Sequence, residues 1–371
     1  MKRVVITTGI FPPDIGGPAT FIPKFGEFLS SHDLDVVVVT LSEDASVQNH
    51  DYPFKVFRIR RSIKRWIRMI VTVTRIASEM RKTDFLFCNG LYLETALALR
   101  LSLFKGRSLV KIVGDPVWER AQNRIVPPNL LFSKLQSLAF LCSKIVERKL
   151  ITWSLIQFDQ VTCPGVELAK TVKNWSNKLN VLVVHNGAKI SVKKEESQKI
   201  YDLIVVSRLV SWKNVDLAIF IANKLDCTLV IVGDGPQRGS LNLQADSNPK
   251  ISFLGSCSND EVGNLLRESR IFCQFSDYEG LSISLLQAMS NSLPCVLSNI
   301  DANRDVFNSD LEAAIFVNIK ERDETASIVS SLLNSKTQQR DLGARARIIV
   351  EQEFNEKDKM REMKNLLIEN D

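Results

Sequence analysis

Histidine is scarce in this sequence, with only His32, His50 and His185 among 371 residues. So few imidazoles argue against a histidine-rich metal centre. The seven cysteines are odd in number, and no two of them are spaced as C-x-x-C. A zinc site or a disulfide framework is therefore disfavoured, and the cysteine usage favours a reducing cytoplasm.

Long apolar runs are also missing. No stretch reaches the roughly 18 consecutive apolar residues that a membrane-spanning helix needs. The N-terminal run Met1–Thr8 has no long apolar segment or small-residue cleavage site, so it predicts a first strand rather than a signal peptide. No G-x-G-x-x-G follows that strand, which disfavours an NAD-dependent dehydrogenase.

Charge is distributed unevenly along the chain. Residues 1–185 carry a net charge of +11, whereas residues 186–371 carry −5. A basic first half suggests contact with an anionic surface or substrate. Because no nucleic-acid-binding motif accompanies the basic residues, we expect no nucleic-acid partner.

Short β-branched runs alternate with amphipathic helical stretches along the whole chain. Most of the runs are apolar without strict alternation, as expected for parallel strands that are covered by helices on both faces. Strand–helix alternation predicts an α/β fold with parallel sheets. The predicted strands are Val4–Thr8, Val36–Thr40, Phe85–Asn89, Ser108–Val113, Gln160–Cys163, Val181–Val184, Asp202–Val206, Thr228–Val232, Ile251–Leu254, Ile271–Phe275, Pro294–Leu297 and Ala314–Val317.

The series of strands restarts after a charged, poorly patterned stretch, Lys189–Lys199, which predicts an interdomain linker. We therefore expect a first domain at 1–188 and a second at 189–354. The C-terminal helix, at about 355–371, is expected to pack back on the first domain. Open α/β sheets bind ligands beyond the carboxyl ends of their strands, so the predicted site is a cleft between the two domains.

Two cations follow the first strand of the second domain. Arg208 and Lys213 lie between strand Asp202–Val206 and the helical pattern Val215–Leu225. A cation at a helix start is unfavourable against the helix dipole unless an anion lies between them, which points to a bound phosphate. The alternative is a pair of solvated surface cations.

A second anion-accepting turn is Glu279-Gly280-Leu281-Ser282, between strand Ile271–Phe275 and a helix around Ser284–Ser290. Gly280 allows close backbone approach, and the amides after it can point at phosphate oxygens. Glu279 can accept hydrogen bonds from sugar hydroxyls. The alternative is a helix N-terminus with a favourable nearby acid.

Two glycine-containing turns at strand ends are weaker signals on their own. Gly16-Gly17 follows the first strand and leads into a helix, which is typical of an anion-accepting loop. Gly233-Asp234 closes strand Thr228–Val232 and is placed to run beside a nucleoside.

Taken in order, these stretches resemble the retaining glycosyltransferases of family 4, and the resemblance covers nearly the whole chain. It implies the GT-B fold, in which two Rossmann-like domains have parallel sheets that face each other across a cleft. Further matching stretches are Cys163-Pro164-Gly165, His185-Asn186-Gly187, Gly233-Asp234-Gly235-Pro236 and Phe253-Leu254-Gly255.

The resemblance also implies residue roles. Arg208 and Lys213 would hold the diphosphate of a nucleotide-sugar donor, and Glu279 would contact the transferred hexose. Two fixed cations and a helix N-terminus can stabilise the departing diphosphate, so no metal or other cofactor is expected. The other implied donor-site residues are Gly16, Gly17, Gly233, Asp234, Gly255, Ser256, Cys257, Gly280, Leu281, Ser282 and Gln287.

The sequence departs from the family pattern at two positions. Gln287 stands where a second glutamate usually accepts from the ribose; its carbonyl oxygen can still accept, without charge assistance. Gly114 lies where a histidine often faces the donor sugar, and the neighbouring Asp115 is the predicted replacement in a catalytic role. For Gln287, the alternative is a residue on a helix surface, and for Asp115 it is an aspartate that only forms a turn. Glu119 and Arg120 are weaker candidates for a role in the site.

The strongest local charge lies in residues 58–70, where one helix face is apolar and the opposite face is cationic. This pattern favours contact with an anionic membrane, the alternative being a helix whose stripe lies in the core. The residues predicted to share the apolar face are Ile59, Ile63, Trp66, Ile70, Val73, Ala77 and Met80.

The predicted function is retaining, metal-independent transfer of a hexose from a nucleotide sugar to a glycan or a polyprenyl-diphosphate-linked acceptor, in cell-surface polysaccharide synthesis. The expected location is cytoplasmic, peripheral at the inner face of the cell membrane. One alternative is a nucleotide-sugar epimerase on the same fold. The other is a non-catalytic protein that binds sugar nucleotides.

Overall fold

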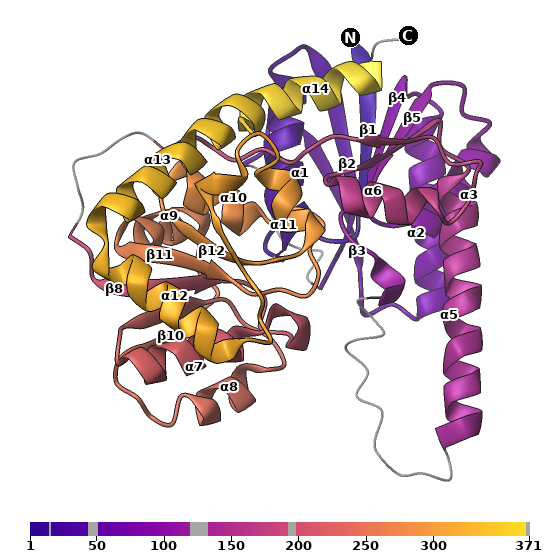
Figure 1. Ribbon diagram of the computed structural model, residues 1–371. Helices are drawn as coiled ribbons and strands as arrows, with labels where there is room; N and C mark the ends of the chain where they lie inside the picture. Colours follow the sequence, from indigo (N-terminus) through magenta and orange to yellow (C-terminus); the bar gives the residue numbers. More distant parts are fainter. Residues whose placement is uncertain (15, 44–50, 119–132, 192–197, 369–371) are drawn as a thin grey trace. The chain divides into compact units, whose positions relative to one another are not determined.

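The computed structural model describes residues 1–14, 16–43, 51–118, 133–191 and 198–368. The chain divides into two compact units (Figure 1). The first comprises Met1–Val184 together with Met360–Asp371, and the second comprises His185–Lys359. These limits lie a few residues from the boundaries predicted at 188 and 354. Glu119, Arg120 and most of the predicted linker are outside the described residues.

The first unit is built on a parallel sheet of seven strands within the described residues, in the order β3-β2-β1-β4-β5-β6-β7. Chain order reverses between β1 and β4, which are hydrogen-bonded neighbours. The strands are β1 (Lys2–Thr8), β2 (Leu34–Ser42), β3 (Lys55–Arg60), β4 (Phe85–Asn89), β5 (Arg107–Lys111), β6 (Gln160–Cys163) and β7 (Val181–Val183).

Helices cover both faces of this sheet. One core contains buried residues of α2, α3, α5 and α6 against one face. The other core contains residues of α1 and α14, among them Phe25, Met363 and Leu367. The helices are α1 (Gly17–Ser30), α2 (Arg65–Met80), α3 (Tyr92–Ser102), α5 (Ser133–Leu155), α6 (Val166–Lys173) and α14 (Glu356–Ile368).

The prediction for residues 58–70 is partly wrong. Residues through Arg60 form strand β3, so Ile59 is a strand residue, and helix α2 begins only at Arg65. The predicted apolar face is also split, because Val73 and Met80 are buried whereas the side chains of Trp66 and Ile70 are 63% and 52% exposed. The helical period was correct, but the core covers only the second half of the helix.

The second unit has a parallel sheet of six strands within the described chain, in the order β10-β9-β8-β11-β12-β13. Its chain order reverses between β8 and β11. The strands are β8 (Tyr201–Val206), β9 (Leu229–Val232), β10 (Ile251–Gly255), β11 (Ser269–Gln274), β12 (Cys295–Ser298) and β13 (Ile315–Val317).

Two cores again flank the sheet. Helices α7, α8 and α12 contribute to one, and α9, α10 and α13 contribute to the other. The predicted fold class, parallel α/β in both halves, is confirmed. The remaining elements are η1 (Ser211–Lys213), α7 (Val215–Leu225), α8 (Arg238–Gln244), α9 (Asn259–Arg267), α10 (Ile283–Ser290), α11 (Asp301–Val306), η2 (Leu311–Ala313), α12 (Arg322–Asn334) and α13 (Lys336–Glu353).

Candidate functional site

The loop after β8 presents the two predicted cations at the carboxyl edge of the second sheet. Arg208 is exposed, and its guanidinium carbon lies 5.5 Å from the centre of the Trp212 ring. Trp212 is buried, so it provides a rigid support for this loop. Lys213 ends the short helix η1, directly before α7. Both cations therefore lie where an open α/β sheet binds its ligand.

Lys213 and Glu279 meet although they are 66 residues apart in the chain. Lys213 Nζ lies 2.5 Å from Glu279 Oε1, and the two side chains are only 16% and 10% exposed. The Ser276 hydroxyl donates to the same carboxylate oxygen at 2.7 Å. The Asp277 amide donates to the Trp212 carbonyl at 2.8 Å, so backbone contact also joins the two loops. The structure thus brings two of the predicted site residues together in a partly desolvated pair.

The turn after this pair leads into the N-terminus of α10. Ser282 is its N-cap and accepts a hydrogen bond from the Leu285 amide at 3.2 Å. Leu281 is buried, and Gly280 is only half-buried at the turn. A helix N-terminus beside an ammonium group is a favourable place for a phosphate.

The Gly233-Asp234 turn packs against the loop that carries Arg208. The Gly233 φ angle is 127°, and a Cβ there would lie 1.9 Å from the Ser207 carbonyl oxygen. The Leu209 amide donates to the Asp234 carbonyl at 2.9 Å. The Gly235 amide and Arg238 hold the pKa of the exposed Asp234 carboxyl below its usual value. This glycine is required for the shape of the loop, and its predicted contact with a nucleoside stays a prediction.

Gln287 lies next to the loop predicted near the base. Its Nε2 donates to Asn259 Oδ1 at 3.3 Å, and Asn259 begins α9 directly after that loop. Gly255 has φ 71°, and its carbonyl accepts from the Gly233 amide at 2.7 Å. The structure therefore brings Gln287 close to the predicted base loop, which includes Gly255, Ser256 and Cys257.

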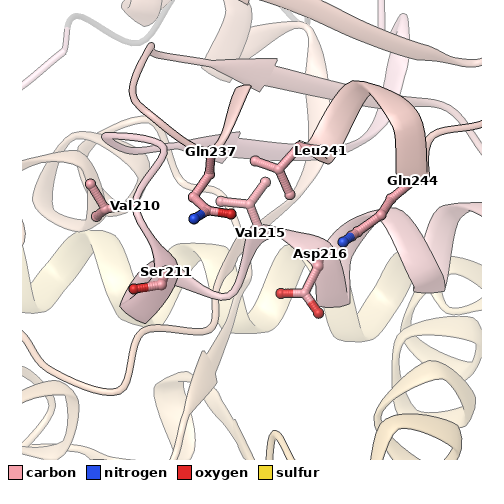
Figure 2. Close-up of a pocket in the computed structure, with 7 residues that line it drawn as sticks. All are labelled: Val210, Ser211, Val215, Asp216, Gln237, Leu241 and Gln244. Carbon is pink, nitrogen blue, oxygen red and sulfur yellow. The ribbon is translucent and has the colours of Figure 1, made fainter. Parts of the chain in front are cut away.

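A small cavity of about 180 Å³ lies between η1, α7 and α8 (Figure 2). None of the predicted site residues lines it. It is smaller than the roughly 300–1,000 Å³ typical of small-molecule sites. The ion pair at the carboxyl edge is therefore the better candidate for donor binding. The cavity is lined by Val210, Ser211, Val215, Asp216, Gln237, Leu241 and Gln244.

In the first unit, the glycine loop after β1 is held by an ion pair that the sequence did not reveal. Arg61 contacts both carboxylate oxygens of Asp14, at 2.7 and 3.2 Å, and also donates to the Gly9 carbonyl at 2.8 Å. Gly16 is the N-cap of α1, with φ 152°, and Gly17 is the first helical residue. A bidentate arginine–carboxylate pair of this kind fixes orientation as well as position.

Asp115 is buried and has several structural partners. Its Oδ1 accepts from the amides of Val117 and Trp118 at 3.0 and 3.1 Å, and its Oδ2 accepts from Arg148 of α5 at 2.8 Å. These contacts fit the alternative of a turn-forming aspartate better than that of a catalytic acid or base. Its catalytic role stays a prediction.

Among the described residues, no group of three or more His, Cys, Asp or Glu side chains is placed to hold a metal ion. The site chemistry that the described residues present is that of two cations, one carboxylate and a helix N-terminus.

Comparison with known proteins agrees with these observations. The family described as "Glycosyl transferases group 1" matches residues 188–348, which is nearly all of the second unit. The second unit of this chain is thus similar to the group 1 glycosyl transferases.

Individual relatives match this chain over segments of different length. An Escherichia coli protein, "UDP-Gal:alpha-D-GlcNAc-diphosphoundecaprenol alpha-1,3-galactosyltransferase", is 35% identical over 24% of this chain and 23% of its own. "N-acetyl-alpha-D-glucosaminyl L-malate synthase" of Bacillus anthracis is 27% identical over 50% of each chain. The alignments thus span half or less of these relatives' lengths.

The fold of this chain is found in solved structures. Sucrose-phosphate synthase of Thermosynechococcus elongatus superposes with a TM-score of 0.78, covering 99% of this chain and 98% of its own, at 14% identity. At that identity the likeness concerns the fold alone. It confirms the predicted GT-B fold class.

Several polar residues with close partners could not be found from the sequence. Arg61 and Arg148 lay within basic stretches and carried no motif, so their acidic partners could be found only in three dimensions. Asn89 ends a predicted strand, and a polar residue at that place was a usable signal; Lys111 lay inside the predicted strand Ser108–Val113, whereas the observed β5 ends at Lys111.

Proposed function

We propose that this chain transfers a hexose from a nucleoside-diphosphate sugar to an acceptor hydroxyl, with retention at the anomeric carbon and without a metal. The Lys213–Glu279 pair is the observation that carries the proposal. It combines a cation for the diphosphate with a carboxylate for the sugar at one strand edge. Arg208 and the N-terminus of α10 flank the pair in sequence and add positive potential.

Bond cleavage between the anomeric carbon and the β-phosphate oxygen leaves negative charge on the nucleoside diphosphate. Lys213 has three donors, of which Glu279 uses one, so the remaining donors can bind phosphate oxygens. Fixed cations that interact more strongly with the departing diphosphate than with the bound donor lower the barrier. Glu279 can then accept from the hydroxyls of the transferred hexose. For retention, the acceptor oxygen bonds to the anomeric carbon on the face that the diphosphate leaves, and the hydroxyl proton passes to the departing phosphate oxygen.

We propose a glycan or a polyprenyl-diphosphate-linked sugar as the acceptor, in the synthesis of a cell-surface polysaccharide. The name of the Escherichia coli relative, which specifies a diphosphoundecaprenol-linked acceptor, supports this choice. An enzyme that uses a lipid-linked acceptor works at a membrane, so we place the protein in the cytoplasm at the inner face of the cell membrane. Within the described chain, no helix is long and apolar enough to span a bilayer.

Contact with the membrane is proposed to occur through the first two turns of α2. Trp66, Met69 and Ile70 are 63%, 36% and 52% exposed there, although they continue the apolar face that is buried further along. The exposed Lys64 and Arg65 flank them. Exposed apolar side chains next to cations match the interface of an anionic bilayer, where tryptophan is enriched.

The transfer is tested with labelled UDP-, GDP-, ADP- and dTDP-hexoses, a polyprenyl-diphosphate-linked N-acetylglucosamine and EDTA. We expect label to enter the lipid fraction from one donor, with its anomeric configuration retained. Isomerisation of a donor without acceptor would indicate an epimerase, and donor binding without turnover would indicate a binding protein. Turnover that is lost in EDTA and restored by magnesium would contradict the metal-independent mechanism.

Membrane contact is tested by flotation with vesicles of phosphatidylcholine alone and with one quarter phosphatidylglycerol. We expect the protein to float with the anionic vesicles and the double variant Trp66→Ser/Ile70→Ser to stay behind. Leu101→Ser/Leu103→Ser removes two exposed apolar side chains at the end of α3 and serves as the matched control. Equal flotation of both variants would show that Trp66 and Ile70 do not form the membrane contact.

A further inference from the structure

Three polar residues end three neighbouring strands of the first unit. Thr8 ends β1, Asn89 ends β4 and Lys111 ends β5. Thr8 pairs with Asn89, and the pairing of Cys88 with Val110 places Asn89 beside Lys111 one residue further along. All three side chains are buried, with at most 2% of any one exposed. They form a polar row across the carboxyl edge of the sheet.

This polar row lies on the face that α1 covers. Two residues earlier in the same strands, Ile6, Phe87 and Leu109 belong to the core formed with α1 and α14. Side chains alternate between faces along a strand, so the residues of the polar row share that face. Lys111 Nζ lies 4.3 Å from the centre of the Phe21 ring, one turn into α1.

The Asn89 amide group is the unexplained part of the row. Among the described residues, neither its Oδ1 nor its Nδ2 has a hydrogen-bond partner, although both atoms are buried. Each such group costs about 1–3 kcal/mol when it is left unsatisfied. Buried polar side chains are nearly always paired, so an orphaned amide is a reason to look for a missing partner.

The position in the sheet is one at which ligands bind. β1 and β4 flank the reversal of strand order, where open α/β sheets form a crevice beyond their carboxyl ends. The backbone is tightly packed there, since a Cβ on Gly90 would lie 2.7 Å from the Gly9 amide nitrogen. Helix α1 starts at this edge with glycines, no side-chain cap and no acidic residue in its first turn.

We propose that Asn89, Lys111 and the N-terminus of α1 form a subsite for a phosphorylated sugar, the acceptor of the transfer proposed above, on which this assignment rests. The ammonium group and the helix amides bind the phosphate oxygens. The Asn89 amide both donates to and accepts from a sugar hydroxyl, which satisfies both of its orphaned atoms.

The surroundings of Lys111 are compatible with an anion-binding site, provided that the Phe21 ring moves aside. Burial is the main cause that lowers the pKa of Lys111, to about 7; Cys163 and Glu362 of α14 act in the opposite direction. Phe21 is only partly buried, and its ring has to move for a phosphate to reach the ammonium.

The test is calorimetric titration of the full chain with α-glucose 1-phosphate, and separately with UDP, GDP, ADP and dTDP. We expect saturable binding of the sugar phosphate to the unmodified protein. Asn89→Leu and Lys111→Met should each weaken it by about tenfold or more, because each removes a hydrogen bond or a charge. Both variants should bind the nucleotide as before. Lys213→Ala should weaken nucleotide binding and leave sugar-phosphate binding unchanged.

Stability distinguishes this role from a structural one. Asn89→Leu should not lower the melting temperature of the free protein, because it removes unsatisfied polar atoms. Asn180→Leu is the matched control; its amide donates to Gln160 Oε1 at 2.7 Å in the same unit, and its loss should destabilise. An Asn89→Leu variant as destabilised as the control would show that a buried water already satisfies the amide, and would overturn the proposal.

Three other outcomes would overturn it. The first is that α-glucose 1-phosphate shows no saturable binding. The second is that Asn89→Leu and Lys111→Met bind it as tightly as the unmodified protein does. The third is loss of sugar-phosphate binding in Lys213→Ala, which would place the ligand at the donor site. Failure of every nucleotide to bind would instead count against the proposed transfer. The two ideas therefore fail separately.

Discussion

Replacing Lys111 by methionine should make the protein more stable, and the gain should depend on pH. The side chain is 1% exposed, and burial lowers its pKa from 10.5 to about 7. Below pH 7 the folded chain carries a buried ammonium at full cost. Between pH 7 and 10.5 the unfolded chain holds the proton that the folded chain has released, so the stability of the unmodified protein rises with pH.

The magnitude follows from the same values. At about 1.4 kcal/mol for each pKa unit, the buried charge costs on the order of 5 kcal/mol below pH 7. Methionine has a similar volume but forgoes the cation–π contact with Phe21, which is worth about 0.5–2 kcal/mol. The net gain at pH 6 is therefore about 3 kcal/mol, or about 6–12 °C in Tm for a unit of this size.

Thermal unfolding followed by calorimetry at pH 6 and pH 9.5 measures this gain. We expect a large rise in Tm at pH 6 that has mostly disappeared at pH 9.5. Lys105→Met, which changes an exposed lysine just before β5, should show no difference at either pH. A Lys111→Met variant that is destabilised at pH 6, or equally stabilised at both pH values, would refute the reasoning.

Two further substitutions test the loops around the site. Gly233→Ala should destabilise the folded protein by several kcal/mol and weaken nucleotide binding, because the added Cβ would clash with the Ser207 carbonyl that precedes Arg208. Gly239→Ala, whose Cβ would contact no other atom, is the control in both the unfolding and the nucleotide-titration experiments. Asp115→Asn should destabilise by about 2–4 kcal/mol, because it leaves Arg148 without its anionic partner. If Asp115 only shapes the turn, the folded variant keeps its kcat at low temperature; a kcat that falls by orders of magnitude in a folded variant would instead restore a catalytic role.

Every strand that consists of an apolar, β-branched run could be predicted from the sequence, because a strand buried on both faces is apolar along its whole length. It missed β3, an edge strand whose alternating charged and apolar residues merged with the basic helix that follows. Edge strands commonly carry charges, so they resemble amphipathic helices in short windows. Trp66 and Ile70 lie on the predicted apolar face of α2, but the point at which burial of that face ends could not be predicted, since the limit of a core is a tertiary property.

For the candidate site, residue type and motif order were enough to select Lys213 and Glu279, which the fold then places in contact. Ion pairs between residues that share no motif could not be selected in this way. The Arg61–Asp14 pair joins residues 47 positions apart in the loops after β3 and β1, and the Arg148–Asp115 pair joins α5 to a residue 33 positions away, so both depend on the tertiary arrangement. The Asn89–Lys111 neighbourhood depends on strand register, which local patterns do not specify.

Nucleotide binding in EDTA tests most directly whether Lys213 holds the donor diphosphate without a metal. Titration calorimetry with UDP, GDP, ADP and dTDP would be run on the unmodified chain, on Lys213→Ala and on Lys224→Ala, an exposed lysine at the end of the following helix. We predict that at least one nucleotide binds in EDTA, that Lys213→Ala raises its Kd by about 10- to 150-fold, and that Lys224→Ala leaves it unchanged. An unchanged Kd in Lys213→Ala, or binding that requires magnesium, would contradict the account.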